Sequence, residues 1–159
     1  IRIAEAIIAG KTIDEIHAIT EEAIKNITLY IGLETLDFGV RGGRVPASVK
    51  KIADLLKINP ILSFTSKGIK PVGKTFGRKN IIQKFKNYVQ KTIDWNQPLR
   101  IGISHANCEE KAFELRDDFI QKSGKKNVFV SEVGPGLGAH AGPGAMVIAI
   151  QTLFDSLND

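Results

Sequence analysis

Residues 134–144, GPGLGAHAGPG, constrain the fold of this chain more than any other stretch. Five glycines and two prolines surround a single histidine, His140. Gly and Pro are the residues least compatible with a helix interior, and a plain hairpin turn needs only about two to five residues. We therefore expect a non-helical loop between two strands, where the backbone approaches something small and His140 is aimed at it.

The segments around this loop alternate between helical and strand patterns. Helices are expected over residues 1–10, 12–26, 46–57, 78–94 and 108–122. Strands are expected over residues 28–34, 99–105 and 127–133, in a hairpin over 59–76 that turns at Ser66-Lys67-Gly68, and, as strand or helix, over 145–154. This alternation predicts an α/β (α+β) fold, a mixed sheet flanked by helices.

Two of the expected helices carry clear local signals. Thr12 and Glu15 have the spacing of a capping box, with Thr12 as the N-cap. Apolar residues then recur at helical spacing and are expected to face the core. These inward residues are Ile13, Ile16, Ile19 and Ala23 in one helix, and Val49, Ile52, Ala53 and Leu56 in the other.

Length and composition describe an ordinary globular domain. The chain has 159 residues, of which 43% are hydrophobic, and no apolar run approaches the roughly 20 residues of a membrane-spanning helix. The single cysteine, Cys108, excludes an intrachain disulfide, which is typical of a reducing compartment. We expect a cytoplasmic protein.

Charge is distributed unevenly along the chain. Residues 41–91 contain thirteen Lys or Arg and one acidic residue, Asp54, so this segment carries +12 and the remainder −7 of the net +5. Such asymmetry favours an acidic partner for the middle of the chain, whether nucleic acid, phosphate or an acidic protein face.

Two basic motifs lie in this segment. Arg41-Gly42-Gly43-Arg44 precedes an expected helix, and two guanidinium groups beside glycine amides can hold a phosphate or carboxylate. Gly73-Lys74-Thr75 resembles part of a phosphate-binding loop, but the residues before it have a strand pattern and Gly77 interrupts any following helix. A nucleotide loop is therefore not expected, and Lys74 and Arg78 are interpreted as basic contact residues.

His140 is the leading candidate binding residue. An imidazole in a glycine-rich turn can bind a ligand carboxylate together with backbone amides. His17 and His105 have no partners at metal-ligand spacing and Cys108 is isolated, so no metal or cofactor is expected. His105 follows a strand and is compatible either with a site or with a backbone hydrogen bond.

Four segments together resemble one known family. They are TLDFGVRGGRV (35–45), NPIL (59–62), PVGK with GRK (71–74 and 77–79) and GAHAGPG (138–144). Their order and spacing over residues 28–150 resemble those of the DegV family, the fatty-acid-binding subunits that serve a bacterial fatty-acid kinase. That family has two α/β domains with a long-chain fatty acid, such as palmitate, stearate or oleate, held between them.

The resemblance implies roles for individual residues. His140 would contact the fatty-acid carboxylate, with Gly138, Ala139 and Gly142 shaping its surroundings. Contact with phosphate or with the kinase would fall to Arg41, Gly42, Gly43, Arg44, Lys74 and Arg78. The chain would then be a carrier without catalytic residues, and the partner kinase would form the acyl phosphate.

The resemblance also implies a division of the chain. The opening IRIAEAIIAG looks like the middle of a helix, so residues 1–27 are expected to belong with a preceding domain. Residues 28–159 are expected to form the DegV C-terminal lipid-binding domain. Two other functions stay open: a basic nucleic-acid- or phosphate-binding module, and an enzyme that uses His140 as a general base.

Overall fold

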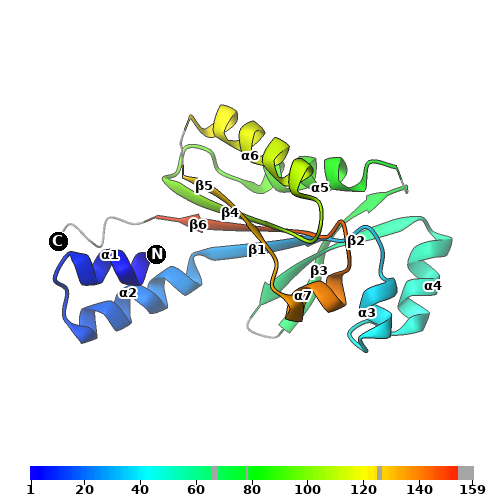
Figure 1. The fold of residues 1–159 in the computed structure, drawn as a ribbon, viewed down its shortest axis with the longest axis horizontal. Coiled ribbons are helices and arrows are strands. Elements are labelled where there is room, and N and C mark those ends of the chain that lie inside the picture. The colour runs from blue at the N-terminus through cyan, green and yellow to red at the C-terminus, as the bar shows by residue number, and fades with distance from the viewer. Residues whose placement is uncertain (66–67, 78, 125–126, 154–159) are drawn as a thin grey trace.

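The computed structural model describes residues 1–65, 68–77, 79–124 and 127–153, in which helices and strands alternate (Figure 1). The helices are α1 (Arg2–Ile8), α2 (Ile13–Lys25), α3 (Asp37–Arg41), α4 (Ala47–Leu55), α5 (Ile81–Thr92), α6 (Glu109–Ser123) and α7 (Pro135–Ala141). The strands are β1 (Ile27–Gly32), β2 (Ile58–Thr65), β3 (Gly68–Phe76), β4 (Leu99–His105), β5 (Val128–Glu132) and β6 (Met146–Thr152).

The six strands form one mixed sheet in the order β3-β2-β1-β6-β4-β5. β4 and β5 are parallel, and the other neighbouring pairs are antiparallel. β1 and β4 are both antiparallel to β6, so β1, β4 and β5 run in the same direction. They end together, because Gly32 and His105 both lie opposite Met146, and His105 lies opposite Glu132. We call this end, at the right of Figure 1, the carboxyl end of the sheet.

Helices α5 and α6 cover one face of the sheet (Figure 1). In α5, Ile81, Phe85 and Val89 recur every four residues and are buried, as an amphipathic helix on a sheet requires. Gly32 permits the close contact, because a Cβ there would lie 2.6 Å from the Phe85 ring. The larger of the two hydrophobic cores is formed on this side.

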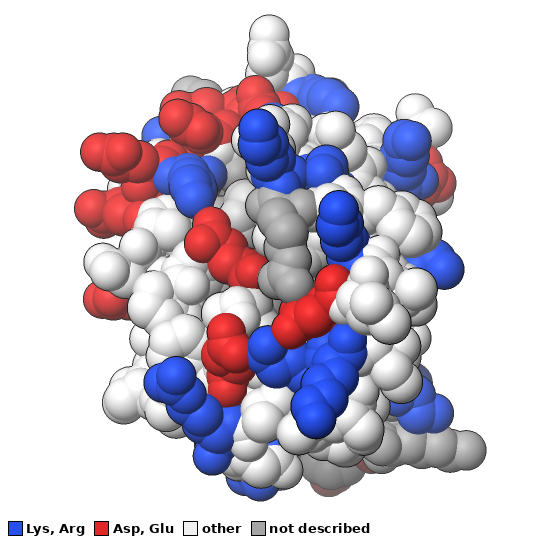
Figure 2. Space-filling model, turned by 90° about the vertical axis from the view of Figure 1, so that its right-hand side faces the viewer, with Lys and Arg blue, Asp and Glu red and all other residues white. Residues whose placement is uncertain are grey.

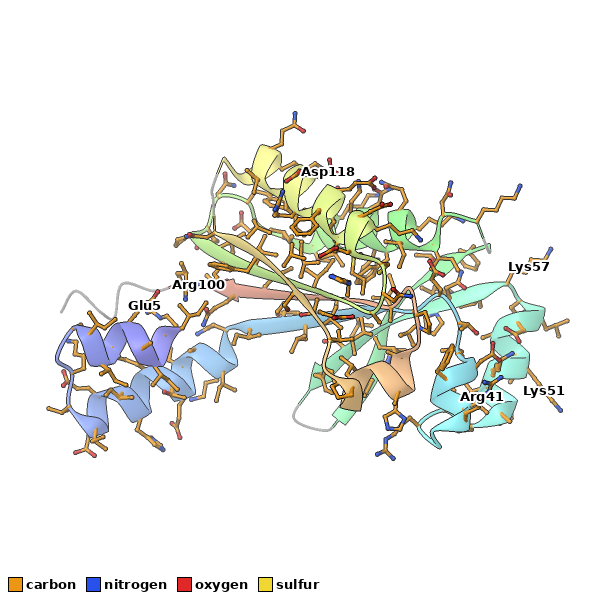
Figure 3. All side chains as sticks on the ribbon, in the orientation of Figure 1. Glu5, Arg41, Lys51, Lys57, Arg100 and Asp118 are labelled. Atoms are coloured by element: carbon orange, nitrogen blue, oxygen red, sulfur yellow. The ribbon has the colours of Figure 1, made fainter. Side chains whose placement is uncertain are left out.

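Among the described residues, helices cover the opposite face at its two ends (Figure 1). α3, α4 and α7 pack beneath the carboxyl end, where a second core includes Ile31, Leu36 and Ala141. At the far end, the α1–α2 hairpin is joined to the sheet by an ion pair between Glu5 and Arg100 of β4 (Figure 3). The backbone amide of Thr152 also donates to the carbonyl of Asn26, at 3.1 Å.

Much of the predicted secondary structure is confirmed. The mixed α/β sheet, the hairpin of β2 and β3, and the Thr12–Glu15 capping box are all present. The chain after Ala145 is a strand, which decides between the two predicted alternatives. Of the predicted hairpin turn, Ser66 and Lys67 lie outside the described residues, and Gly68 begins β3.

The prediction that residues 134–144 are non-helical is wrong, because Pro135–Ala141 forms α7. Pro135 occupies the first helical position, where its missing N–H has no intrahelical acceptor to lose. Gly142, with φ +77°, ends the helix after seven residues. The glycines and prolines therefore define the ends of a short helix.

The predicted inward faces of two helices are also partly wrong. In α4 only Ala53 is buried, while Val49, Ile52 and Leu56 are 49%, 59% and 55% exposed. The physical reason is that α4 packs mainly against β2 and α3, which leave most of its apolar stripe uncovered. In α2, Ile19 is buried, but Ile13 is 80% exposed.

Candidate functional site

The candidate site lies at the carboxyl end of the sheet, where the segments that follow β1 and β5 meet. β1 continues through residues 33–36 into α3, and β5 continues through residues 133–134 into α7. α3 and α7 then pack against each other below the sheet (Figure 1). The topology therefore brings the RGGR and GAHAGPG motifs together, although they are about one hundred residues apart in sequence.

Two glycines make this packing possible. A Cβ on Gly42 would overlap the imidazole of His140, with Nδ1 and Cε1 as the nearest atoms. A Cβ on Gly142 would likewise overlap the ring of Phe38. Gly42 thus accommodates a ring from the second motif, and Gly142 accommodates a ring from α3, so the two segments form one unit, which we call the α3–α7 unit (residues 37–44 and 135–144).

The His140 ring is held on one side by this contact. Its Nδ1 is buried and has no hydrogen-bond partner among the described residues. A buried polar atom without a partner costs about 1–3 kcal/mol, so the packing of Nδ1 against Gly42 is unfavourable by itself. With Nδ1 facing Gly42, Nε2 is the ring nitrogen left to bind a ligand.

The backbone amides around His140 are used within α7. The amide of Gly138 donates to the carbonyl of Gly134 at 3.0 Å, and that of Gly142 donates to Gly138 at 2.9 Å. Ala139 lies between them in the same helix and is exposed. The expected set of free glycine amides beside His140 is therefore not formed by Gly138 and Gly142.

Arg41 and Arg44 stand at the exposed edge of the α3–α7 unit. Neither makes an ion pair with any residue in the described part of the chain. The Arg41 guanidinium lies 5.8 Å from the centre of the Phe38 ring, within the range of a cation–π contact. The turn after Arg41 is closed by a hydrogen bond from the Arg44 amide to Gly39, at 2.8 Å.

A polar cluster fixes α3 relative to α4. The hydroxyl of Thr35 donates to Asp37 at 2.5 Å, and Lys50 of α4 bridges Asp37 at 3.2 Å and Asp54 at 2.5 Å. The Thr35 hydrogen bond, followed by that from Lys50, lowers the pKa of Asp37. The two carboxylates, Asp54 first, raise the pKa of Lys50. The charged forms are thus favoured on both helices.

The remaining predicted basic residues lie elsewhere. Gly73, Lys74 and Thr75 belong to β3, so they do not form a phosphate-binding loop. Lys74 is exposed and its Nζ lies 5.3 Å from the centre of the Phe76 ring. Arg78 lies outside the described residues.

Charge is unevenly distributed over the carboxyl end of the sheet. Figure 2 looks onto this end: acidic side chains gather at the upper left, while Lys and Arg predominate over the top and the lower part, with a few acidic side chains among them near the centre. Arg41 of α3, Lys51 of α4 and Lys57, just after α4, lie on this side of the molecule (Figure 3). The basic side of this end is therefore continuous with the α3–α7 unit.

Two pockets open near the carboxyl end of the sheet. One, of about 370 Å³, lies between the starts of α5 and α6 and is lined by residues such as Ile81, Lys86 and Leu115. The other, of about 710 Å³, lies between β5 and the start of α6 and includes His105 and Pro143. Neither is lined by His140, so a channel leading to that ring stays a prediction.

Sequence analysis missed most residues of the second pocket. His105 was considered as either a site residue or a strand-end histidine bonded to the backbone, and Glu34 and Glu132 were not singled out. Their positions in the sequence could have identified them, because all three stand at or just after the ends of β1, β4 and β5.

In the part of the chain that the structure describes, no cluster of three or more His, Cys, Asp or Glu has a metal-binding arrangement. The helices described are all too short or too polar to cross a membrane.

Comparison with known proteins gives a consistent result. The model of a family of uncharacterised proteins, the DegV family, matches residues 1–153. The protein DegV of Bacillus subtilis is 32% identical over 128 residues, which are 80% of this chain and 46% of that protein. The chain spans about half the length of the curated relatives it matches.

Solved structures agree with this comparison. DegV of Bacillus subtilis, described as a fatty-acid-binding protein, has a TM-score of 0.75 and 31% identity, covering 96% of this chain and 54% of that one. A Thermotoga maritima protein, described as having a fatty-acid-binding function, has a TM-score of 0.74 and 25% identity, covering 95% and 52%. The mixed sheet with its helices is thus the fold of these proteins.

Proposed function

Because the chain belongs to the DegV family, we propose that it forms the part of a fatty-acid-binding protein in which His140 contacts the carboxylate. One observation carries this proposal: the imidazole is fixed against Gly42, its Nδ1 lacks a partner, and its other nitrogen is left for a ligand. The ligand is a long-chain fatty acid, and no cofactor takes part.

Relatives support the ligand class. The Bacillus subtilis and Thermotoga maritima proteins of the same fold are described as binding fatty acids. Burial of a saturated chain is worth about 0.8 kcal/mol per CH₂, or roughly 10 kcal/mol for sixteen carbons before the costs of binding. Affinity therefore comes from the hydrocarbon tail, and one well-placed imidazole is sufficient to orient the head group.

The exposed basic residues suit a second role, delivery of the bound acid to a fatty-acid kinase. Arg41 and Arg44 flank Gly42 and Gly43 beside His140 and make no ion pair among the described residues. We assign this RGGR turn, together with Lys74 and Arg78, to contact with the kinase or its phosphate. The carrier itself performs no chemistry, and the kinase forms the acyl phosphate in the cytoplasm.

The apolar channel requires more than this chain. Exposed apolar residues remain on the α1–α2 hairpin and on α4, where Ile8 is 87% and Leu55 is 82% exposed. We propose that residues 1–27 pack with a second domain, that residues 28–159 are the lipid-binding domain, and that the channel is completed between them. The spans of the relatives, about twice this chain, are compatible with such a domain.

The test uses the full-length protein purified from bacteria, with native mass spectrometry for bound fatty acid. His140→Ala is expected to lower retained fatty acid at least fivefold, because the carboxylate loses its partner. Arg41→Ala with Arg44→Ala is expected to leave retention unchanged and to reduce acyl-phosphate formation with the kinase.

His17→Ala is the matched control, since the His17 side chain is 76% exposed on α2, far from the site. Equal retention by the His140 and His17 variants would refute the assigned contact. Loss of lipid from the double arginine variant would show that these arginines belong to the lipid site instead.

A further inference from the structure

A second site lies beside the α3–α7 unit, in the groove of about 710 Å³ between β5 and the start of α6. We propose that this acidic groove binds an extended segment of a partner protein through a lysine or arginine side chain. The inference does not depend on fatty-acid binding. The residues that line the groove include Glu34, His105, Glu109, Glu110, Phe113 and Glu132.

The lining is strongly acidic, and its charges come from three separate segments. Glu34 follows β1, Glu109 and Glu110 begin α6, and Glu132 ends β5. The single lysine, Lys111, is held by Glu34 at 3.0 Å. The other three glutamates make no ion pair within the described ranges. A concave surface lined by one sign of charge concentrates the potential and attracts a cation.

The two glutamates at the start of α6 are also favoured by the helix itself. Glu109 and Glu110 stand in the first turn, where the helix dipole favours carboxylates. Glu34 and Glu132 belong to no helix, and helix formation does not account for their position opposite Glu109 and Glu110. The groove thus holds more negative charge than α6 itself requires.

His105 supplies an independent indication of a ligand. It lines the groove, is only 6% exposed, and its Nδ1 is buried without a hydrogen-bond partner among the described residues. It lies directly opposite Glu132 across the β4–β5 pair. A buried imidazole that lines an acidic groove and has unused hydrogen-bonding capacity calls for an explanation, and a polar ligand in the groove would supply one.

The shape of the groove favours an extended segment. β5 is the last strand of the sheet, so its outer edge has no strand partner within the described residues, and Val130, Ser131 and Glu132 line the groove. A strand added at such an edge gains backbone hydrogen bonds and presents alternate side chains to the pocket. Phe113, 37% exposed, also lines the groove, and the Arg116 guanidinium lies 4.6 Å from the centre of its ring.

The probe is the blocked, fluorescent hexapeptide RTRTRT, titrated into the full-length protein in 50 mM salt. Because this chain carries a net charge of +5, general attraction does not favour a polycation. Glu109→Gln with Glu132→Gln is expected to weaken binding at least fivefold. The control Glu21→Gln with Glu22→Gln removes the same charge from α2 and is expected to change binding less than twofold.

A second measurement uses the unmodified protein. The imidazole signals of His105 in ¹H–¹⁵N spectra are expected to shift with RTRTRT and to stay unchanged with ETETET. Equal weakening in both double variants, equal binding of the two peptides, or unmoved His105 signals would each overturn the proposal. Fatty-acid retention is expected to be the same in all of these variants, so failure here leaves the lipid proposal intact.

Discussion

Gly42 and Gly142 leave room for aromatic rings that pack directly against their backbone. Sequence analysis singled out His140 and the glycines around it, and expected close approach to a small ligand. The structure instead has side chains of the same chain in that space, with His140 over Gly42 and Phe38 over Gly142. Glycine composition predicts close approach, but it cannot identify the neighbour, because that neighbour lies about one hundred residues away.

This account predicts opposite effects for two Gly→Ala changes. Gly42 has φ −81° and ψ 4°, which alanine adopts easily, so Gly42→Ala isolates the overlap with the His140 ring. We expect it to lower the free energy of unfolding by about 1–3 kcal/mol and to displace the ring. Gly136→Ala in α7 meets nothing within 4 Å and is expected to raise that free energy by up to about 1 kcal/mol. Urea unfolding of the two variants measures both effects, and equal values would contradict the ring contact.

Secondary-structure elements were predictable where local signals decide them. The capping box of α2 follows from the spacing of Thr12 and Glu15, while the alternating burial of β4 and the amphipathic face of α5 follow the period of their apolar residues. α7 was missed because the positions of Pro135 and Gly142 matter more than the Gly and Pro content between them. The apolar stripe of α4 was recognised, but what covers it depends on non-local packing.

The contact between α3 and α4 predicts a specific pH dependence. The pKa of Asp37 is lowered by Thr35 and Lys50, so its contribution to stability is present at neutral pH and is lost as the pH falls below about 4. We expect Asp37→Asn to lower stability at pH 7 and to reduce the loss of stability between about pH 4 and pH 2.5. Asp14→Asn, at the exposed start of α2, is the control. Urea midpoints across this range provide the measurement, and parallel curves for wild type and Asp37→Asn would contradict the assignment.

The carboxyl end of the sheet has an acidic gathering on one side, and Lys and Arg predominate over the rest of it (Figure 2). The basic surface adjoins His140, and the acidic groove lies on the side of α6 and β5. The charge asymmetry was predictable from sequence, as was the fold class. The groove was not, because its carboxylates come from segments that only the sheet topology brings together. The ion pair of Glu5 with Arg100, at the opposite end, holds the α1–α2 hairpin to the sheet with many of its isoleucines exposed.

The most direct test of the proposed function follows the imidazole itself. Full-length protein labelled with ¹⁵N-histidine is freed of lipid and titrated with palmitate, and the His140 resonances are assigned by their loss in His140→Ala. Binding is expected to shift the Nε2 signal of His140 and to leave His17 unchanged. If palmitate binds and the His140 signals do not move, the carboxylate lies elsewhere and the account is wrong.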